Sequence, residues 1–423
     1  MGALLLLLLV LFTAGVPIAL ALGIAPLPTL MDRNIPLIAI PQVIFESLDS
    51  FALMALPLYV LAGRLMQFGG IAERLVHLAV ALVSWMPGGL GAAVVLTSMM
   101  FATISGSSAA TAAAIGSMLI PEMERQRYPR PFSAATTASS GELGVILPPS
   151  VPMVLYGVIA GVSIGDLFIA GFLPGLMIGL SLILVVSLTA WAKGYGKRVP
   201  FSLGVWAPDV WRALRRAALS LMMPVIILGG IFGGVFTATE AAVVAVAYAL
   251  FLGVVVYRKI TVRDLPRIFA DAAVTSAVVM IIVAFAAMFA FSLNVIRAPQ
   301  TIGAALASVS ENPLVFLLLV NLFLLVVGMF METFAAIIIL APILAPIALS
   351  YGIDPVHFGL IMIVNLAIGM VTPPVGVNLF IACGIARISM EELMRPLAVF
   401  LAILVLNLMV VTYVPGLSLG LLR

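Results

Sequence analysis

The chain has 423 residues, of which 64% are hydrophobic and 9% charged, and its formal net charge is +3. Soluble domains carry about 25% charged residues, so this composition excludes a soluble globular protein and indicates a membrane protein. The small net charge gives no indication of nucleic-acid binding, and one cysteine with two histidines excludes a disulfide and a cysteine- or histidine-based metal cluster.

Apolar runs of about 20 residues recur along the chain, each long enough to cross the ~30 Å hydrocarbon layer. The first run, 3–22, lacks a basic flank and a small-residue cleavage site, so we expect a retained helix. The pattern predicts an all-α polytopic protein with crossings at about 3–22, 48–68, 131–160, 168–191, 217–235, 239–257, 273–296, 356–382 and 396–414. The short mixed segments 71–86 and 298–311 are expected to lie in the membrane interface as connecting arms.

Two segments of about 34 residues, 88–121 and 313–346, carry a small or polar interruption near the middle. The interruption is Ser105-Gly106-Ser107-Ser108 in the first and Gly328 through Thr333 in the second. Two full crossings need about 40 residues plus a turn. We therefore expect each segment to form a re-entrant hairpin of two half-helices, with its tip near the middle of the membrane. The alternative is one long tilted helix with a polar spot.

A Pro-Pro pair interrupts each of the apolar segments 131–160 and 356–382, four residues after a glycine. The first break holds Gly144, Pro148 and Pro149, and the second holds Gly369, Pro373 and Pro374. Neither segment is expected to be a continuous helix, because two prolines remove two N–H donors and clash with the preceding turn. Irregular backbone in hydrocarbon needs protein cover or a cavity, so paired breaks indicate a transporter site at mid-membrane.

The two halves of the chain repeat each other. A shift of 225 residues places Gly144 on Gly369, the first Pro-Pro pair on the second, and Pro121 on Pro346. The chain then divides into a first repeat, 1–200, and a second repeat, 201–423, each with one hairpin and one broken helix.

Basic residues are distributed unequally between the loops of the two repeats. The loop 122–131 holds three arginines, whereas its counterpart 347–356 has no Lys or Arg. Loops 193–216 and 258–267 are also basic. The positive-inside rule places all three basic loops in the cytoplasm, with the N-terminus inside, the C-terminus outside and the two hairpins in opposite orientations. This arrangement is the inverted-topology repeat of a transporter.

The tips and the breaks supply the candidate binding groups. Exposed carbonyls and hydroxyls suit a hard cation such as sodium, and helix N-termini suit a carboxylate. Candidate cation ligands are Ser105, Gly106, Ser107 and Ser108 opposite the first break, and Met331, Glu332 and Thr333 opposite the second, where Thr372 adds a hydroxyl. Candidate substrate-binding residues are Ser108, Ser150, Thr372 and Asn378.

Each of these residues also has a structural interpretation. Ser and Thr in membrane helices often bond to the carbonyl four residues earlier or allow close packing. Glu332 differs, because a carboxylate at membrane depth costs roughly 2.5–3.5 kcal/mol and so indicates a function. Glu142 and Glu240 lie nearer segment ends, where capping or interface exposure explains them equally well. Without an obvious mid-membrane Arg or Lys, we expect N–H groups, hydroxyls and sodium to hold a substrate carboxylate, and not Arg64 or Arg297.

Four motifs at the tips and breaks read ATISGSSAATAAAIGSMLIPEM, ILPPSVPMVLYGV, METFAAIIILAPILAPIA and GIDPVHFGLIMIVNLAIGMVTPPVGVNLFIA. They resemble the large membrane subunit of tripartite ATP-independent periplasmic (TRAP) transporters, the dicarboxylate M (DctM-like) type, over nearly the whole chain. The resemblance implies no enzyme and no cofactor, but a sodium-driven secondary transporter with an elevator mechanism, in which hairpins and broken helices move together against a static scaffold.

The resemblance also implies partners and a location. The partners are a small four-helix membrane subunit (Q type), a periplasmic substrate-binding protein (P type) and an organic acid, which in this family is a dicarboxylate, sialic acid, keto acid or sugar acid. The location is a bacterial or archaeal inner membrane. No four-helix segment precedes residue 1, so we expect the small subunit to be a separate chain.

In this family the sodium ligands come from the hairpin tips and the broken-helix carbonyls. The matching positions of this chain are Ser105 through Ser108 with Gly144 and Leu147, and Met331 through Thr333 with Gly369 and Thr372. One departure is Glu142 in GELGV, where the resemblance leads us to expect a smaller neutral residue.

Other functions stay open at this point. A stand-alone proton-coupled or antiport carrier would use Glu332 as its proton site and would work without partners. An intramembrane serine hydrolase would use Ser107 or Ser108 with a histidine at the same depth, whereas His77 and His357 fall in regions predicted to be interfacial. A channel or an assembly scaffold would need neither the duplicated breaks nor the inverted charge.

Overall fold

The computed structural model describes residues 2–36, 38–196 and 201–422. Within these ranges every regular element is helical and no β-strand occurs. The helices up to residue 193 are α1 (Gly2–Thr13), α2 (Ile18–Ile24), α3 (Pro26–Asp32), α4 (Ala39–Leu48), α5 (Ala55–Phe68), α6 (Ile71–Val83), α7 (Gly89–Ser105), α8 (Ser108–Arg125), α9 (Arg130–Gly141), α10 (Leu143–Ile146), α11 (Val151–Ala160) and α12 (Ile164–Lys193). The later helices are α13 (Leu203–Phe232), α14 (Ala238–Leu250), α15 (Leu265–Val295), α16 (Ala298–Val309), α17 (Pro313–Phe330), α18 (Thr333–Ser350), α19 (Pro355–Gly369), α20 (Val377–Ala386), α21 (Met390–Tyr413) and α22 (Gly416–Leu419).

Eight helices of the described residues are long and apolar enough to cross a membrane. Their bounds are Phe51–Phe68, Ile164–Lys193, Leu203–Phe232, Ala238–Val256, Leu265–Val295, Pro313–Phe330, Thr333–Ser350 and Met390–Tyr413. A further span consists of Arg130–Ile146 and Val151–Ala160, which are bent by 42° around the first Pro-Pro pair. The predicted crossings from 48–68 through 273–296 and at 396–414 are confirmed, and the chain is an all-α polytopic membrane protein.

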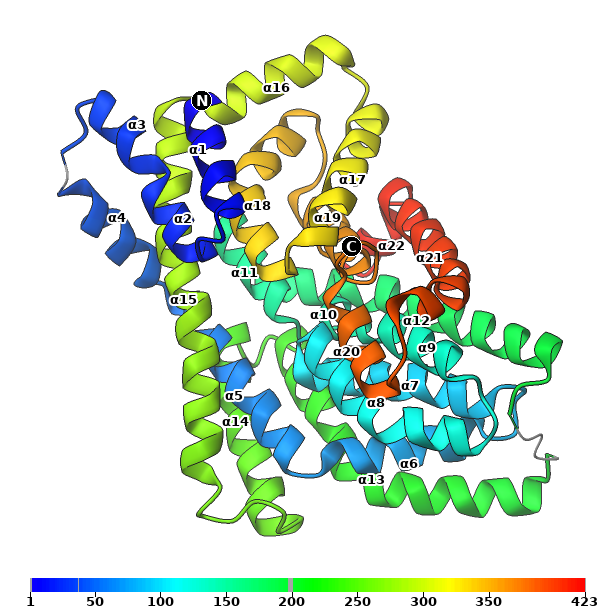
Figure 1. The fold of residues 1–423 in the computed structure, drawn as a ribbon. Coiled ribbons are helices and arrows are strands. Elements are labelled where there is room, and N and C mark those ends of the chain that lie inside the picture. The colour runs from blue at the N-terminus through cyan, green and yellow to red at the C-terminus, as the bar shows by residue number, and fades with distance from the viewer. Residues whose placement is uncertain (1, 37, 197–200, 423) are drawn as a thin grey trace.

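The N-terminal segment departs from the predicted single crossing over 3–22. It forms two short helices, α1 and α2, because Gly15 adopts a left-handed φ of +76° and Pro17 cannot donate a backbone hydrogen bond. In Figure 1, helix α1 lies at the same end of the molecule as α16, opposite the α14–α15 connection. The predicted place of the N-terminus, on the same side as the basic loops, is therefore wrong.

Both predicted hairpins are present as pairs of helices joined by a two-residue turn, so the alternative of one long tilted helix is wrong. The turns contain Gly106 between α7 and α8, and Glu332 between α17 and α18. The second helix of each pair continues to Arg125 or Ser350, beyond Pro121 or Pro346, where the hairpin was expected to end. Helix α7 packs along α8, whereas α17 packs on α19 and α18 packs on α11 and α19.

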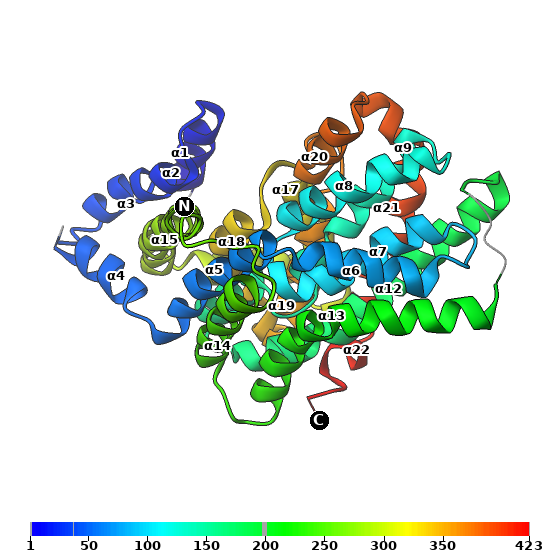
Figure 2. The same cartoon turned by 90° about the horizontal axis from the view of Figure 1, so that it is seen from below.

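The helices form two groups that lie side by side. In the first, which we call the outer group, α14 and α15 pack along α5. In the second, the core group, α20 lies on α8 and α9, and α12 packs on α7 and α21. Figure 2, the view from below, shows α13 running from the outer group beneath the core group. Helices α6 and α16 run across opposite ends of the molecule (Figure 1), as expected of the two connecting arms.

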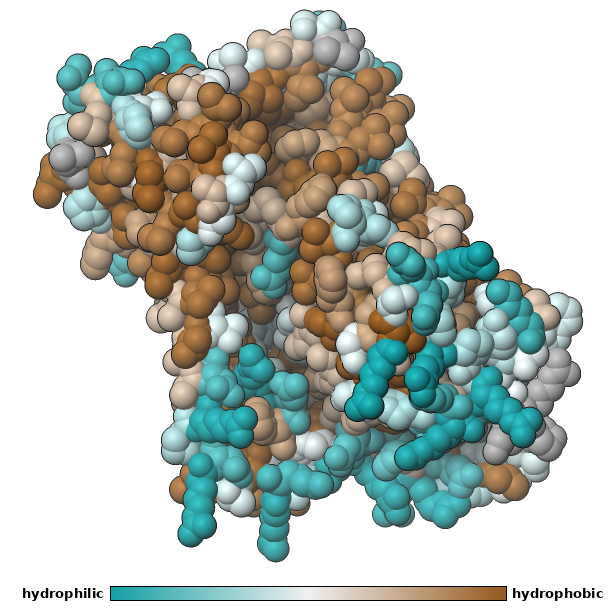
Figure 3. Space-filling view, viewed as in Figure 1, coloured by the Kyte–Doolittle hydropathy of each residue, from teal (hydrophilic) through white to brown (hydrophobic). Residues whose placement is uncertain are grey.

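The surface is apolar over much of its middle, with hydrophilic residues at both ends and most of them at the lower end (Figure 3). Hydrophilic residues gather at the lower end, around the start of α13 and the α14–α15 connection. That connection holds Arg258, Lys259 and Arg263, so the positive-inside rule places this end in the cytoplasm. In the basic loop predicted at 193–216, Lys197 and Arg198 lie outside the described residues, and the part from Leu203 onward is already helix α13.

A capping box begins α14. Thr237 Oγ1 accepts a hydrogen bond from the Glu240 N–H at 3.2 Å, and Glu240 Oε2 accepts one from the Thr237 N–H at 2.8 Å. Thr237→Ala is expected to lower the free energy of unfolding by about 1 kcal/mol, because the hydroxyl satisfies an orphan N–H of the first turn. The measurement is the melting temperature in detergent, with Thr301→Ala, which removes only an in-helix bond to a carbonyl, as the control. Equal melting temperatures for both variants would contradict the role of this cap.

Candidate functional site

The tip of the first hairpin gathers hydroxyl groups around one carbonyl. Gly106 ends α7 with a left-handed φ of +59°, and the extended Ser107 begins α8. The Ser107 carbonyl accepts a hydrogen bond from Thr111 Oγ1 at 2.8 Å, and Ser105 Oγ lies 2.8 Å from the same Thr111 oxygen. The turn therefore concentrates carbonyl and hydroxyl oxygens, which are the ligands that hard cations prefer.

The first break is extended backbone between two short helices. Leu147 follows α10 in the extended conformation, the Pro148–Pro149 peptide bond is cis, and Ser150 precedes α11. Ser150 Oγ donates a hydrogen bond to the Val145 carbonyl at 2.6 Å. This bond satisfies a carbonyl of α10 that has no partner in a continuing helix.

The second hairpin tip and the second break follow each other along the chain in the same order as the first tip and the first break. Met331 is extended, and Glu332 occupies the N-cap position of α18 without a side-chain capping bond. Thr333 Oγ1 lies 3.1 Å from Met370 Sδ, which ties α18 to the residue just after α19. Thr372 Oγ1 donates to the carbonyl four residues earlier at 2.7 Å, so its lone pairs stay available as acceptors.

One glycine of each broken helix contacts the facing hairpin. A Cβ atom on Gly144 would lie 2.5 Å from the Ser107 carbonyl oxygen, and one on Gly369 would overlap the backbone of Gly328 in α17. Gly144 and Gly369 both stand four residues before a Pro-Pro pair. The repeated spacing noted in the sequence therefore corresponds to a repeated contact between hairpin and break.

Ser108 and Asn378 connect the two halves of the chain. Asn378 Nδ2 donates a hydrogen bond to Ser108 Oγ at 2.5 Å, and both side chains are buried. Asn378 Oδ1 has no hydrogen-bond partner within the described residues. Two of the four predicted substrate-binding residues therefore meet, whereas Ser150 and Thr372 bond to carbonyls of their own broken helices.

A small cavity of about 90 Å³ lies where the core group meets the outer group. The first hairpin contributes Ser105 and Ser107, and Phe334 comes from the start of α18. The rest of the lining is Val60, Gly63, Arg64 and Gln67 of α5, Phe101 of α7, Ala110 of α8, Val151 of α11, and Thr275 and Val279 of α15. Both hairpins and Val151, just after the first break, thus border one small cavity.

Arg64 was missed by the sequence analysis, which expected no arginine among the binding groups. It lies in the same cavity lining as Ser105 and Ser107. The signal that could have found it is its spacing on α5. Val60, Arg64 and Gln67 fall on one face of a helix, so a tip that touches this face also meets the arginine.

Two other expectations about titratable residues need correction. Glu142 is fully buried, and neither carboxyl oxygen has a hydrogen-bond partner in the described part of the chain. Its interpretation as a cap or an interface residue is therefore wrong. His357 is also buried, with Nε2 3.2 Å from the Thr412 carbonyl and Nδ1 3.2 Å from Ser418 Oγ. These contacts occupy both ring nitrogens away from the serines of the tip, so His357 is not a base for a serine hydrolase.

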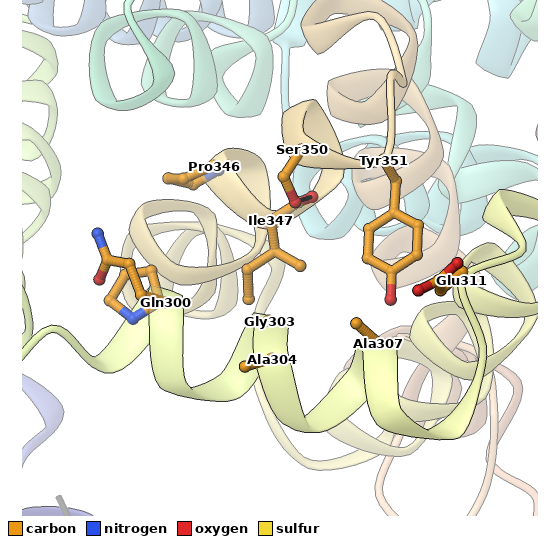
Figure 4. Close-up of a pocket in the computed structure, with 10 residues that line it drawn as sticks. Gln300, Gly303, Ala304, Ala307, Glu311, Pro346, Ile347, Ser350 and Tyr351 are labelled. Atoms are coloured by element: carbon orange, nitrogen blue, oxygen red, sulfur yellow. Dashed lines mark hydrogen bonds between the residues drawn. The ribbon is translucent and has the colours of Figure 1, made fainter.

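A wider, open groove of about 540 Å³ lies between α16 and the C-terminal end of α18. Figure 4 shows Gln300, Gly303, Ala304 and Ala307 along α16, facing Pro346, Ile347, Ser350 and Tyr351. The groove is lined by neither hairpin tip and by neither break. The smaller cavity is lined by Ser105 and Ser107 of the first tip and by Phe334 from the start of α18, so that cavity, and not this groove, is the candidate binding site.

The all-helical fold, with its two hairpins, its two Pro-Pro breaks and a cavity that both hairpins border, defines a membrane transporter subunit. The tripartite ATP-independent periplasmic transporter DctM component family matches residues 5–417. The chain belongs to this family, as the motifs at the tips and breaks predicted.

Individual relatives match along almost the whole chain. The C4-dicarboxylate TRAP transporter large permease protein DctM of Rhodobacter capsulatus is 39% identical over 98% of this chain and 97% of its own length. The isethionate TRAP transporter permease protein DctMQ of Oleidesulfovibrio alaskensis is 44% identical over 95% of this chain. This chain spans only 63% of the length of that second relative.

One solved structure shares the fold at low sequence identity. It is the YdaH transporter of Alcanivorax borkumensis, described as having an unusual topology. The TM-score is 0.63 with 16% identity, and the match covers 89% of each chain. At this identity the likeness shows the fold alone.

Proposed function

We propose that the chain is the large membrane subunit of a sodium-gradient-driven importer of an organic acid. The observation that carries this proposal is the convergence of both hairpins and the first break on one cavity at the border between the core and outer groups. A site at such a border can open to either side when the two groups move relative to each other. We further propose an elevator motion of this kind, with the halves 1–200 and 201–423 as inverted repeats.

Sodium is proposed to bind at the two tips. In the first half its ligands would come from Ser105 through Ser108 with Gly144 and Leu147, and in the second half from Met331, Glu332, Thr333, Gly369 and Thr372. The hydroxyl and carbonyl oxygens around Ser107 support the first site, because sodium, like other hard cations, prefers oxygen ligands. The free lone pairs of the Thr372 hydroxyl support the second.

The substrate is proposed to be an organic acid delivered by a periplasmic binding protein. The relatives above are named for C4-dicarboxylates and for isethionate, so a small carboxylate or sulfonate is the class to test first. A small four-helix membrane subunit is the proposed second partner, and a bacterial inner membrane is the proposed location.

One observation favours a proton-coupled carrier as a second candidate. Glu142 lies fully buried beside the first break with neither carboxyl oxygen paired in the described residues. A buried carboxyl without a partner is costly in its charged form, so this group is suited to hold a proton. In that case a pH gradient would drive uptake, and Glu142→Gln would abolish the dependence of uptake on pH.

Uptake into proteoliposomes tests both candidates. The chain is co-purified with its small subunit, supplied with the binding protein, and assayed with labelled succinate, isethionate and N-acetylneuraminate. We expect uptake of one acid under an inward sodium gradient, with a matched potassium gradient as the control. Equal uptake in potassium with a response to pH would favour the proton-coupled carrier, and no uptake of any of the acids would refute the organic-acid proposal.

A further inference from the structure

Helix α5 presents a cationic side chain to the candidate cavity. Val60, Gly63, Arg64 and Gln67 line it, at the i, i+3, i+4 and i+7 positions of one helical face. A Cβ atom on Gly63 would lie 3.3 Å from the Ser105 carbonyl oxygen, so this face of α5 touches the tip of the first hairpin directly. Arg64 therefore stands next to the point where core and outer groups meet.

No carboxylate of the described residues neutralises Arg64. None of the residues that line the cavity is acidic, and the ion pairs of the described chain involve other basic residues. The guanidinium donates only a long hydrogen bond, 3.5 Å, to Thr275 Oγ1 on α15. A partly buried arginine on a membrane-spanning helix is costly unless a partner of opposite charge completes the site.

The remaining lining supplies both hydrogen-bonding groups and apolar surface. Ser105, Ser107, Gln67 and Thr275 surround the cavity with hydrogen-bonding groups, and Val151, Val279, Phe101 and Phe334 supply apolar surface. The cavity volume is about 90 Å³, so the site is small and suits a compact anionic group. A planar guanidinium binds the oxygens of such a group in pairs, which a lysine ammonium cannot do.

We propose that Arg64 binds the carboxylate or sulfonate group of the transported acid, with Thr275 orienting the guanidinium. This proposal rests on the proposed organic-acid transport and adds the residue that recognises the anionic end. Because Arg64 belongs to α5 of the outer group while Ser105 and Ser107 belong to the first hairpin, substrate bound here contacts both groups. Arg64 and Thr275 are not among the proposed sodium ligands, so variants of these two residues can separate substrate recognition from sodium binding.

The experiment measures uptake kinetics and sodium binding on the same variants of the complete transporter. The variants are Arg64→Ala, Arg64→Lys and Thr275→Val, with Arg263→Ala in the exposed α14–α15 connection as the matched control. The probe is whichever of succinate, isethionate or N-acetylneuraminate the wild-type complex carries. Sodium binding is followed as the sodium-dependent rise in melting temperature of each purified variant.

We expect Arg64→Ala to raise the KM by about 10- to 100-fold, the range of a lost charge-assisted hydrogen bond, while the sodium-dependent rise in melting temperature stays as in wild type. Arg64→Lys should recover part of this loss, Thr275→Val should give a smaller rise in KM, and Arg263→Ala should change neither quantity. Wild-type kinetics in Arg64→Ala would overturn the proposal and leave organic-acid transport intact. If Arg64→Ala does not fold, wild-type kinetics in both Arg64→Lys and Thr275→Val would overturn it. A wild-type complex that carries none of the acids would overturn the proposed function itself, and this proposal with it.

Discussion

Sodium should raise the melting temperature of the purified chain, whereas potassium and choline at the same ionic strength should not. A cation that binds only the folded state stabilises it by RT ln(1 + [L]/Kd), which is about 2.7 kcal/mol at a hundredfold excess over Kd. Oxygen ligands gathered at the two tips are the physical basis of this expectation. The measurement is thermal unfolding in detergent, followed by intrinsic fluorescence over a range of sodium concentrations.

Ser108→Ala and Thr372→Ala should each reduce this sodium-dependent increment. Ser108→Ala also removes the buried bond from Asn378, so its melting temperature without sodium should fall as well. The quantity to compare is therefore the rise in melting temperature that sodium causes, and not the melting temperature itself. Ser117→Ala is the matched control, because Ser117 lies on the exposed face of the same helix. An increment that appears equally with potassium, or that survives both variants, would contradict sodium binding at these tips.

Gly369→Ala should destabilise the protein by about 1–3 kcal/mol, the usual cost of overpacking a filled interior. The added methyl group would overlap the Gly328 backbone, where no flexible side chain can move aside. Since the cost comes from separating α17 from α19, we also expect weaker uptake in proteoliposomes. The measurement is the melting temperature in detergent, compared with that of the wild type.

Gly384→Ala provides the control for this change. Gly384 lies inside α20 with open space around the position of a new Cβ atom. Replacing a helical glycine by alanine at such a site stabilises a protein by roughly 0.5–1 kcal/mol, because the unfolded chain loses conformational freedom. If both alanine variants melt at the same temperature, the close approach of α17 and α19 does not limit stability.

The sequence predicted the interior of this fold better than its N-terminal end. Pro-Pro pairs and the Gly106 turn are strong local signals, because proline removes a donor and glycine permits a left-handed φ whatever surrounds them. The run 3–22 has the composition of a spanning helix, and the weaker signals of Gly15 and Pro17 were outweighed by its hydrophobicity. A hydrophobic composition indicates that a segment lies in the membrane, but it does not indicate whether the segment forms one helix or two.

Only part of the candidate site could be predicted, again because only local sequence signals can be recognised. The tip serines and the glycines before each break are neighbours in sequence or carry a repeated spacing, so their roles could be inferred. Arg64 and Glu142 could not be placed, since their environment is set by helices distant in the chain. The spacing of Val60, Arg64 and Gln67 marks one face of α5, but it does not show that Thr275 on α15 meets this face. Nothing in the residues around Glu142 shows that its side chain is buried.

The bond between Ser108 and Asn378 has a consequence for the biogenesis of the protein. At about 5–20 residues per second, a ribosome needs roughly 14–54 s to proceed from one residue to the other. During that interval the faces of α8 and α9 that α20 later covers have no cover from this chain. The first hairpin therefore completes its packing only after most of the second half has been synthesised. In a nascent chain released before residue 377, the Ser108 hydroxyl and the faces of α8 and α9 would stay exposed to lipid or to membrane chaperones.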